Sequence, residues 1–235
     1  KHSLDKMKIR AKVFLEPVGK NTTAAIYIAA KNSKKSDTLL VLPSDHLINN
    51  DEELIRAIEY LDTLKLFNNW FVFGIVPITP SSEYGYIKLN QNQKKNLSLL
   101  NKKKFNVEQV LSFTEKPSKN IALKMFNSKN YLWNSGIFVS NASFVISSIS
   151  NHSSEISKSC DKAISSQFST YNLDFINFDE NTFNKIPSQS IDYAVIEKEN
   201  DIKCIQLNIQ WEDIGSWDNL LKIIKYNNIK NNNLV

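Results

Sequence analysis

The chain has 235 residues, of which 42% are hydrophobic and 23% are charged, values that are ordinary for a soluble globular protein. Its 29 basic and 24 acidic residues give a formal charge of +5, and because the lysines are scattered we expect no nucleic-acid groove. The sequence has no apolar segment of membrane-spanning length and no signal peptide, and Cys160 and Cys204 lie far apart without metal-site spacing. We therefore expect a cytoplasmic protein with reduced thiols and no membrane partner.

Apolar segments typical of strands alternate with segments of helical periodicity along most of the chain. The expected strands cover residues 13–16, 39–43, 70–76, a short stretch after Gly85, and residues 107–115 and 202–207. The expected helices start at caps (Asn21 or Thr22, Asn50 or Asp51, and Ser118) and end near Ala30, Lys65 and Phe126, and others cover residues 153–166, 190–198 and 218–226.

Two further segments complete the pattern: a polar insertion at residues 90–106, expected as an exposed hairpin or loop, and a turn, strand and helix start within residues 131–146. The alternation of strands and helices favours an α/β fold with a mostly parallel sheet flanked by helices. We expect one domain over residues 1–227 and a polar tail at residues 228–235.

The strand expected at residues 39–43 is continuously apolar, which predicts that it is buried on both faces. It ends at Pro43, and Asp45 and His46 follow almost immediately. Ligands of open α/β sheets bind at the carboxyl ends of strands, so an acid at this position is a candidate for chemistry. Taken alone, Asp45 is better interpreted as a turn residue or a helix cap.

Polar residues follow other expected strands in the same way. They are Asp45, the pair Glu115 and Lys116, Asn134 and Ser135 in a turn, and the pair Glu212 and Asp213. Two acids from different strands are the usual means of holding a divalent cation against phosphate oxygens, and a lysine supplies a charge for a phosphate. His46 is interpreted as a hydrogen-bonded neighbour of Asp45 rather than as a base. These residues predict a metal-assisted enzyme that acts on phosphates.

Seven segments, in this order, resemble the motifs of the mannose-1-phosphate guanylyltransferases. They are EPVGKNTTAAI (16–26), LLVLPSDHLI (39–48), FGIVPITPSSEYGYIK (73–88), FTEKP (113–117), YLWNSGIF (131–138), SIDYAVIEK (190–198) and WEDIGSW (211–217). The resemblance implies a nucleotidyltransferase fold related to glycosyltransferase type A. It also implies transfer of GMP from GTP to mannose 1-phosphate, which gives GDP-mannose and pyrophosphate, with Mg²⁺ as cofactor and a possible homo-oligomer.

The resemblance assigns roles to nine residues. Asp45 and Asp213 match the catalytic, metal-binding acids; Gly85, Glu115, Lys116 and Asn134 match the sugar-phosphate site; and Lys20, Asn21 and Thr22 match the nucleotide-contacting segment. Each residue also has a structural alternative. Glu115 and Lys116 could form a surface pair, Asn134 could form a turn, Trp211 and Trp217 could fill the core, and Asp213 could cap the last expected helix.

The sequence also departs from the family pattern. The family's Gly-rich phosphate loop with its arginine has no counterpart here, and Lys20 replaces an arginine that would contact an anion through two nitrogens. We therefore expect an N-terminally truncated catalytic domain that is inactive or weak as given. The alternatives are a non-catalytic sugar-nucleotide-binding or regulatory homologue, and a pyrophosphorylase for another sugar 1-phosphate.

Overall fold

The structure is a computed structural model, and it describes residues 6–64, 68–90, 105–169 and 175–215. The chain divides into two compact units, Lys1–Thr38 with Asn141–Asn200 and Leu39–Ser140 with Asp201–Val235, called the first and the second unit below. The helix expected at residues 218–226, the tail, Trp217 and most of the polar insertion lie outside the described residues. Within the described ranges, no helix is both long and apolar enough to cross a membrane.

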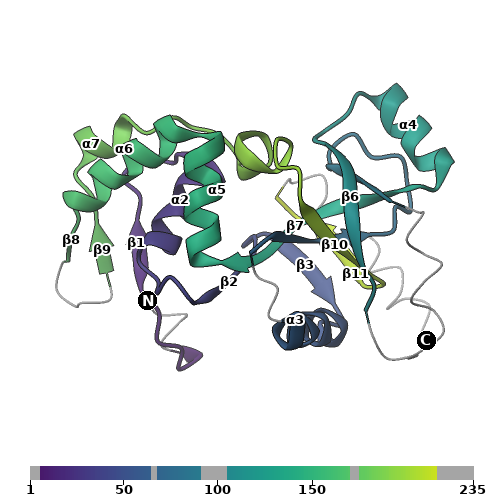
Figure 1. Ribbon diagram of the computed structural model, residues 1–235, viewed down its shortest axis with the longest axis horizontal. Coiled ribbons are helices and arrows are strands. Elements are labelled where there is room, and N and C mark those ends of the chain that lie inside the picture. Colours follow the sequence, from purple (N-terminus) through teal and green to yellow (C-terminus); the bar gives the residue numbers. More distant parts are fainter. Residues whose placement is uncertain (1–5, 65–67, 91–104, 170–174, 216–235) are drawn as a thin grey trace, which may run out of the picture. The chain divides into compact units, whose positions relative to one another are not determined.

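The first unit is mainly helical (Figure 1). Its helices are α2 (Asn21–Lys31), α5 (Ala142–His152), α6 (Ser154–Ser165), α7 (Glu180–Asn184) and the π-helix η2 (Asp192–Ile196). A small sheet has the order β1 (Val13–Leu15), β9 (Phe175–Asn177) and β8 (Phe168–Ser169). Helices α2, α5 and α6 pack together, because the alanines and isoleucines of α2 present short apolar side chains to its neighbours.

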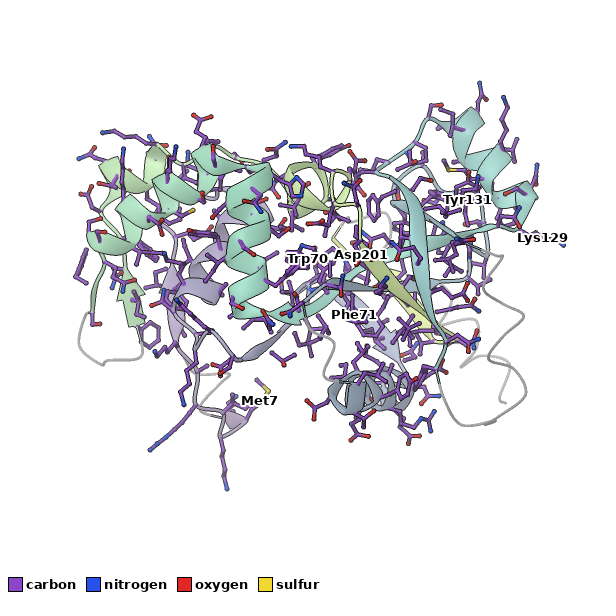
Figure 2. The ribbon with its side chains drawn as sticks, viewed as in Figure 1. Met7, Trp70, Phe71, Lys129, Tyr131 and Asp201 are labelled. Atoms are coloured by element: carbon purple, nitrogen blue, oxygen red, sulfur yellow. The ribbon has the colours of Figure 1, made fainter. Side chains whose placement is uncertain are left out.

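The second unit is built on a six-stranded sheet. Its order is β2 (Thr38–Val41), β7 (Tyr131–Asn141), β4 (Trp70–Ile75), β10 (Ile202–Leu207), β6 (Val107–Thr114) and β5 (Tyr86–Leu89), and β5 also pairs with β7. Helices α3 (Glu52–Leu64) and α4 (Lys119–Ser128) and a separate two-stranded sheet of β3 (His46–Asn49) and β11 (Gln210–Asp213) complete it. Strands β4 and β10 start side by side, with Trp70 opposite Ile202 and the Asp201 carboxylate accepting from Asn69 Nδ2 at 2.7 Å (Figure 2).

The core of the second unit lies between α3 and one face of this sheet. Leu54, Ala57 and Leu61 recur at helical spacing on α3 and are buried. They pack in one cluster with Phe71 and Phe73 of β4, whose residues are all buried. This core fixes the central strands of the sheet, among them β7, which carries Asn134.

The prediction of a mostly parallel sheet is wrong, because the sheets are mixed. Strand β10 is parallel to β4, and β1 is parallel to β9. The pairs β10–β6, β4–β7, β5–β6, β5–β7, β8–β9 and β3–β11 are antiparallel. The chain passes from β4 to β5 and on to β6 without a described helix, and antiparallel neighbours need no helical crossover.

The prediction that residues 39–43 form a strand buried on both faces is also wrong. Strand β2 ends the described six-stranded sheet, where β7 is its neighbour. The side chains of Leu40 and Leu42 are 41% and 52% exposed, so every second residue faces outward. A continuous apolar run does not distinguish a central strand from an edge strand.

Both cysteines are free and buried, Cys160 in α6 and Cys204 in β10. Burial raises the pKa of the Cys160 thiol to about 12, and burial likewise raises the pKa of the Cys204 thiol. Because the thiolate is the reactive form, we expect neither cysteine of the native protein to react with a chromogenic disulfide reagent at mildly alkaline pH. Both should react at once in denaturant. Rapid modification of the native protein would contradict the buried positions.

Candidate active site

The two predicted metal-binding acids lie next to each other in the second unit. Strands β3 and β11 pair antiparallel with Asp213 opposite His46, and the Ile214 amide donates to the Asp45 carbonyl at 2.9 Å. Residues 210–213 therefore form a strand, and this strand brings Asp213 beside Asp45. Asp45 is exposed and Asp213 is partly exposed, so both carboxylates are open to substrates.

Gly215 shows how close the two carboxylates come. An ideal Cβ built on Gly215 would lie 2.6 Å from Asp45 Oδ2 and 3.0 Å from Asp213 Oδ1. The Gly215 amide also donates to Asp213 Oδ1 at 2.8 Å. Both carboxylates therefore converge on a space that exists because residue 215 has no side chain. Sequence reasoning missed this role, although the glycine was visible in the WEDIGSW segment.

This arrangement fits Mg²⁺ in its donor chemistry. Magnesium is usually held by one or two carboxylates, with water and substrate phosphates completing its six ligands. In the described ranges, no group of three or more His, Cys, Asp or Glu residues is placed to hold a metal ion. Two converging carboxylates are a donor set that a cation shared with phosphate can use.

The predicted sugar-phosphate residues Gly85, Glu115 and Asn134 also come together. An ideal Cβ on Gly85 would lie 2.5 Å from Glu115 Oε2 and 3.3 Å from Asn134 Cβ, and the Asn134 amide donates to the Gly85 carbonyl at 2.8 Å. Lys116 is the next residue in the sequence, and its Nζ lies 3.8 Å from Glu115 Oε1. The Glu115 side chain is 12% exposed and that of Lys116 is 62% exposed, so the carboxylate is fixed while the ammonium reaches solvent.

Asn134 does not lie in a turn, as the sequence suggested, but within the long strand β7. Its side-chain oxygen accepts from the Gly136 amide at 3.2 Å, and Ser135 Oγ donates to the Phe73 carbonyl at 2.8 Å. Gly136 has a φ of +69°, a left-handed conformation that favours glycine. The segment therefore resembles a turn locally while the strand continues through it.

The predicted nucleotide-contacting residues lie in the first unit. Lys20 Nζ donates to the backbone and side-chain oxygens of Asn184 at 2.6 and 3.2 Å, and Thr22 Oγ1 accepts from the Ile191 amide at 2.8 Å. Asn21 Oδ1 accepts from the Thr22 amide at 2.8 Å. Lys20, rather than Asn21 or Thr22, occupies the cap position of α2, and in the described chain its side chain makes no capping bond. The expected cap is therefore wrong.

His46 is a hydrogen-bonded neighbour of Asp45, as interpreted from the sequence. Its Nδ1 accepts from Trp211 Nε1 at 3.1 Å. Burial lowers the pKa of His46, and the carboxylates of Asp213 and Asp45 oppose this effect. Burial also raises the pKa of the Tyr84 phenol to about 12, with Asp213 adding to the shift. Both groups are therefore neutral near neutral pH.

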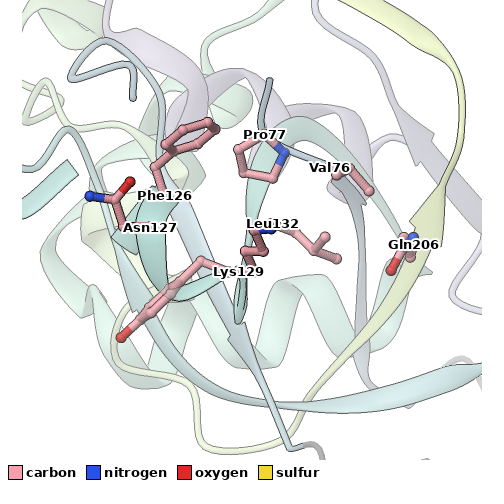
Figure 3. Close-up of a pocket in the computed structure, with 8 residues that line it drawn as sticks. Val76, Pro77, Phe126, Asn127, Lys129, Leu132 and Gln206 are labelled. Carbon is pink, nitrogen blue, oxygen red and sulfur yellow. The ribbon is translucent and has the colours of Figure 1, made fainter. Parts of the chain in front are cut away.

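A cavity of about 360 Å³ lies elsewhere in the second unit (Figure 3). Its lining residues are Val76, Pro77, Phe126, Asn127, Lys129, Tyr131, Leu132 and Gln206. The nine predicted site residues are absent from this lining. The candidate active site is therefore defined by the two carboxylates that converge at Gly215 and by Glu115 and Asn134 at Gly85, not by this cavity.

Comparison with known proteins is consistent with this geometry. The sequence model of a family described as "Nucleotidyl transferase" matches residues 1–228. A mannose-1-phosphate guanylyltransferase of Salmonella montevideo is 38% identical over 215 residues, which are 90% of this chain and 44% of that protein. One of Escherichia coli K12 is 35% identical over 226 residues, which are 92% and 45% of the two chains. The chain thus spans somewhat under half the length of these relatives.

Two solved structures are similar to the chain. A Helicobacter pylori protein described as mannose-6-phosphate isomerase has a TM-score of 0.77 and 29% identity, over 90% of this chain and 79% of its own. A Thermus thermophilus protein described as mannose-1-phosphate geranyltransferase has a TM-score of 0.66 and 26% identity, over 86% and 55%. The resemblance inferred from the seven sequence motifs is therefore confirmed by matches over most of the chain.

Proposed function

The chain belongs to the nucleotidyl transferase family, and from this membership we propose that it carries out GMP transfer from GTP to mannose 1-phosphate, giving GDP-mannose and pyrophosphate. The convergence of Asp45 Oδ2 and Asp213 Oδ1 above Gly215 is the observation that carries the proposal, because phosphoryl chemistry needs such a pair of acids. The names of the curated relatives support the choice of GTP and mannose 1-phosphate as substrates.

The proposed reaction is a substitution at the α-phosphorus of GTP. A phosphate oxygen of mannose 1-phosphate forms a bond to this phosphorus, and the bond to the bridging oxygen breaks, so that pyrophosphate leaves with the electron pair. The attacking oxygen is already an anion, and therefore no side chain has to remove a proton. Catalysis then depends on positioning and on neutralising negative charge.

In this proposal, Asp45 and Asp213 are the residues that would hold Mg²⁺. When bound, Mg²⁺ supplies charge neutralisation at the phosphate oxygens. The acids are open to solvent, which leaves room for phosphate and water as the remaining ligands. The supporting feature is the absence of a Cβ at residue 215, since any side chain there would occupy the same space.

The second group of residues is proposed to bind mannose 1-phosphate. Glu115 accepts hydrogen bonds from sugar hydroxyls, Asn134 hydrogen-bonds the sugar, and Gly85 lets the backbone approach the ring. The exposed ammonium of Lys116 pairs with the sugar phosphate. The buried position of Gly85 against Glu115 and Asn134 supports this assignment, because a side chain at residue 85 would displace the Glu115 carboxylate.

Lys20, Asn21 and Thr22 are proposed to contact the nucleotide. The side-chain oxygens of Asn21 and Thr22 already accept hydrogen bonds from backbone amides. Lys20 Nζ donates twice to Asn184, and an ammonium has three N–H donors. One donor of Lys20 therefore remains for a nucleotide oxygen while its contact with α7 is kept.

The direct test is pyrophosphate release with GTP, mannose 1-phosphate and Mg²⁺ by a version of the chain that also carries the family's phosphate loop, because the chain as given is expected to be inactive or weak. We expect release with this substrate pair, and little with ATP or UTP or with glucose 1-phosphate. Turnover with another pair would assign the site to a different sugar-nucleotide synthesis. Tight binding of GDP-mannose without any pyrophosphate release would contradict the enzymatic proposal and indicate a non-catalytic sugar-nucleotide-binding protein.

Replacing Glu115 with glutamine should raise the KM for mannose 1-phosphate by about 10-fold and leave the KM for GTP near its original value. The substitution keeps the size of the side chain but turns a charge-assisted acceptor of sugar hydroxyls into a weaker, neutral one. Glu59→Gln on the exposed face of α3 is the matched control, and steady-state kinetics with each substrate varied in turn is the measurement. Equal increases for both substrates would indicate a structural role for Glu115.

A further inference from the structure

We propose that the hydrogen bond from Trp211 to His46 positions the carboxylates of Asp45 and Asp213 so that they share one divalent cation. His46 and Trp211 would then be positioning residues of the transfer reaction, without touching substrate themselves. The inference rests on the proposed function, because it assumes that the two acids hold a cation. It goes further by stating what keeps the two acids at the distance that one cation needs.

The backbone pairing that places the acids is short. Strands β3 and β11 have four residues each, and they pair with each other in a sheet of two strands. A two-stranded ladder is marginally stable by itself in water. Asp45 precedes β3 and Asp213 ends β11, so fraying of this ladder would separate the two carboxylates directly. Side-chain interactions must therefore supply part of the stability.

The Trp211–His46 pair spans the ladder diagonally. In the register, Asp213 lies opposite His46 and Trp211 lies opposite Ile48, so all four side chains point to one face of the ladder. Trp211 Nε1 donates to His46 Nδ1 at 3.1 Å, and the two rings meet edge to face with centroids 5.1 Å apart. Trp211 is 6% exposed, so without His46 its N–H would lose its partner in a place that water hardly reaches.

The hydrogen bond also fixes the state of the imidazole. An indole N–H can only donate, so Nδ1 of His46 must be the acceptor and the neutral ring carries its proton on Nε2. The ring also packs on β7, where an ideal Cβ on Gly136 would lie 3.4 Å from His46 Cε1. His46 therefore connects the ladder to the strand that carries Asn134, and its Nδ1 is not left for a metal.

Trp211 is held from its other side by two more aromatic rings. The ring centroids of Tyr84 and Trp211 are 5.0 Å apart, and those of Trp133 and Trp211 are 6.5 Å apart. Tyr84 directly precedes Gly85, and Trp133 directly precedes Asn134. The four aromatic residues thus fix the two acids relative to the proposed sugar-phosphate site, and the Trp211–His46 hydrogen bond is the directional contact among them.

The test measures binding of Mn²⁺ to the protein by titration calorimetry, with Mn²⁺ as a probe for the magnesium site. Trp211→Phe keeps an aromatic ring in the core and removes the N–H, and we expect it to weaken Mn²⁺ binding by about 10-fold, the lower end of the range for residues that orient metal ligands. Trp70→Phe is the matched control. Trp70 lies at the start of β4 and packs on Phe138, with ring centroids 6.0 Å apart, so the same change of side chain there should leave Mn²⁺ binding unchanged.

A second set of variants covers the case in which Trp211→Phe does not fold. His46→Asn keeps a hydrogen-bond acceptor near the position of Nδ1. This variant should therefore bind Mn²⁺ more tightly than His46→Leu does. If the bond acts as proposed, the double variant W211F/H46L should bind Mn²⁺ no more weakly than H46L alone, because both changes remove the same contact. Full affinity in W211F, or additive losses in the double variant, would overturn the inference.

The results also separate this inference from the proposed function. Wild-type protein that binds Mn²⁺ through Asp45 and Asp213 but releases no pyrophosphate would contradict the proposed transfer, while the Trp211 variants would still decide the positioning role. Wild-type protein without any Mn²⁺ binding would overturn both.

Discussion

Replacing Asp213 with asparagine is expected to lower the rate of GMP transfer by at least about 100-fold while the protein stays folded. The amide keeps the shape of the side chain but removes a negative charge from the pair of oxygens that converge above Gly215. A carboxylate is the ligand that hard cations prefer, and the cation in turn offsets charge on the phosphates. Pyrophosphate release under saturating substrates is the measurement.

Glu212→Gln is the control for Asp213→Asn. Glu212 is an exposed neighbour on the same strand, and its side chain points to the opposite face of the β3–β11 ladder. It should keep nearly the full rate. Circular dichroism and the protection of Cys160 and Cys204 from thiol reagents would show that both variants are folded. An Asp213→Asn variant with full turnover would remove this residue from the proposed metal site.

Gly215→Ala is expected to have an effect of similar size, about 100-fold or roughly 2.7 kcal/mol in the barrier. The new methyl group would lie 2.6 Å from Asp45 Oδ2 and 3.0 Å from Asp213 Oδ1, which is inside van der Waals contact. The carboxylates would have to move apart, and the methyl group would occupy the position in which they converge. Residue 215 is exposed, so the loss should appear in activity and in Mn²⁺ affinity rather than in thermal stability.

The chain offers a matched control for this glycine. An ideal Cβ on Gly19 meets nothing within 4 Å, so Gly19→Ala should be neutral in both measurements. Comparison of the two variants separates the steric effect at the acids from the general stiffening that any glycine-to-alanine change brings. Normal activity in Gly215→Ala would mean that the carboxylates work in a different arrangement from the one described.

The sequence predicted the candidate acids better than it predicted the structure that joins them. Asp45 was identifiable because it follows an apolar strand, and Asp213 because its segment resembles a family motif. The ladder that brings them together was missed, since four-residue strands carry almost no periodic signal and pair here with a distant segment. Gly215 was overlooked for a related reason. Its role is to leave space for the carboxylates of Asp45 and Asp213, and no local sequence pattern reveals that these lie beside it.

The errors at β2 and β7 have equally physical causes. The run at residues 39–43 has the composition of a central strand, but burial depends on neighbours that composition does not specify. Asn134 to Gly136 has the composition of a turn, and Gly136 does adopt a left-handed conformation, yet pairing with β4 keeps the segment within a strand. Tertiary pairing overrode local preference in both places.

The hydrogen bond between His46 and Trp211 joins residues that are 165 positions apart in the sequence. During synthesis, the two acids therefore cannot meet until nearly all of the described chain has left the ribosome. Contacts of such long range require closure of a large loop, which slows folding. The unfolded chain has no paired acids, so a cation that bridges them binds the native state alone and raises its stability with the logarithm of cation concentration. The pairing of Asp45 with Asp213, which comes late in folding, is thus also a step that magnesium in the cell would favour.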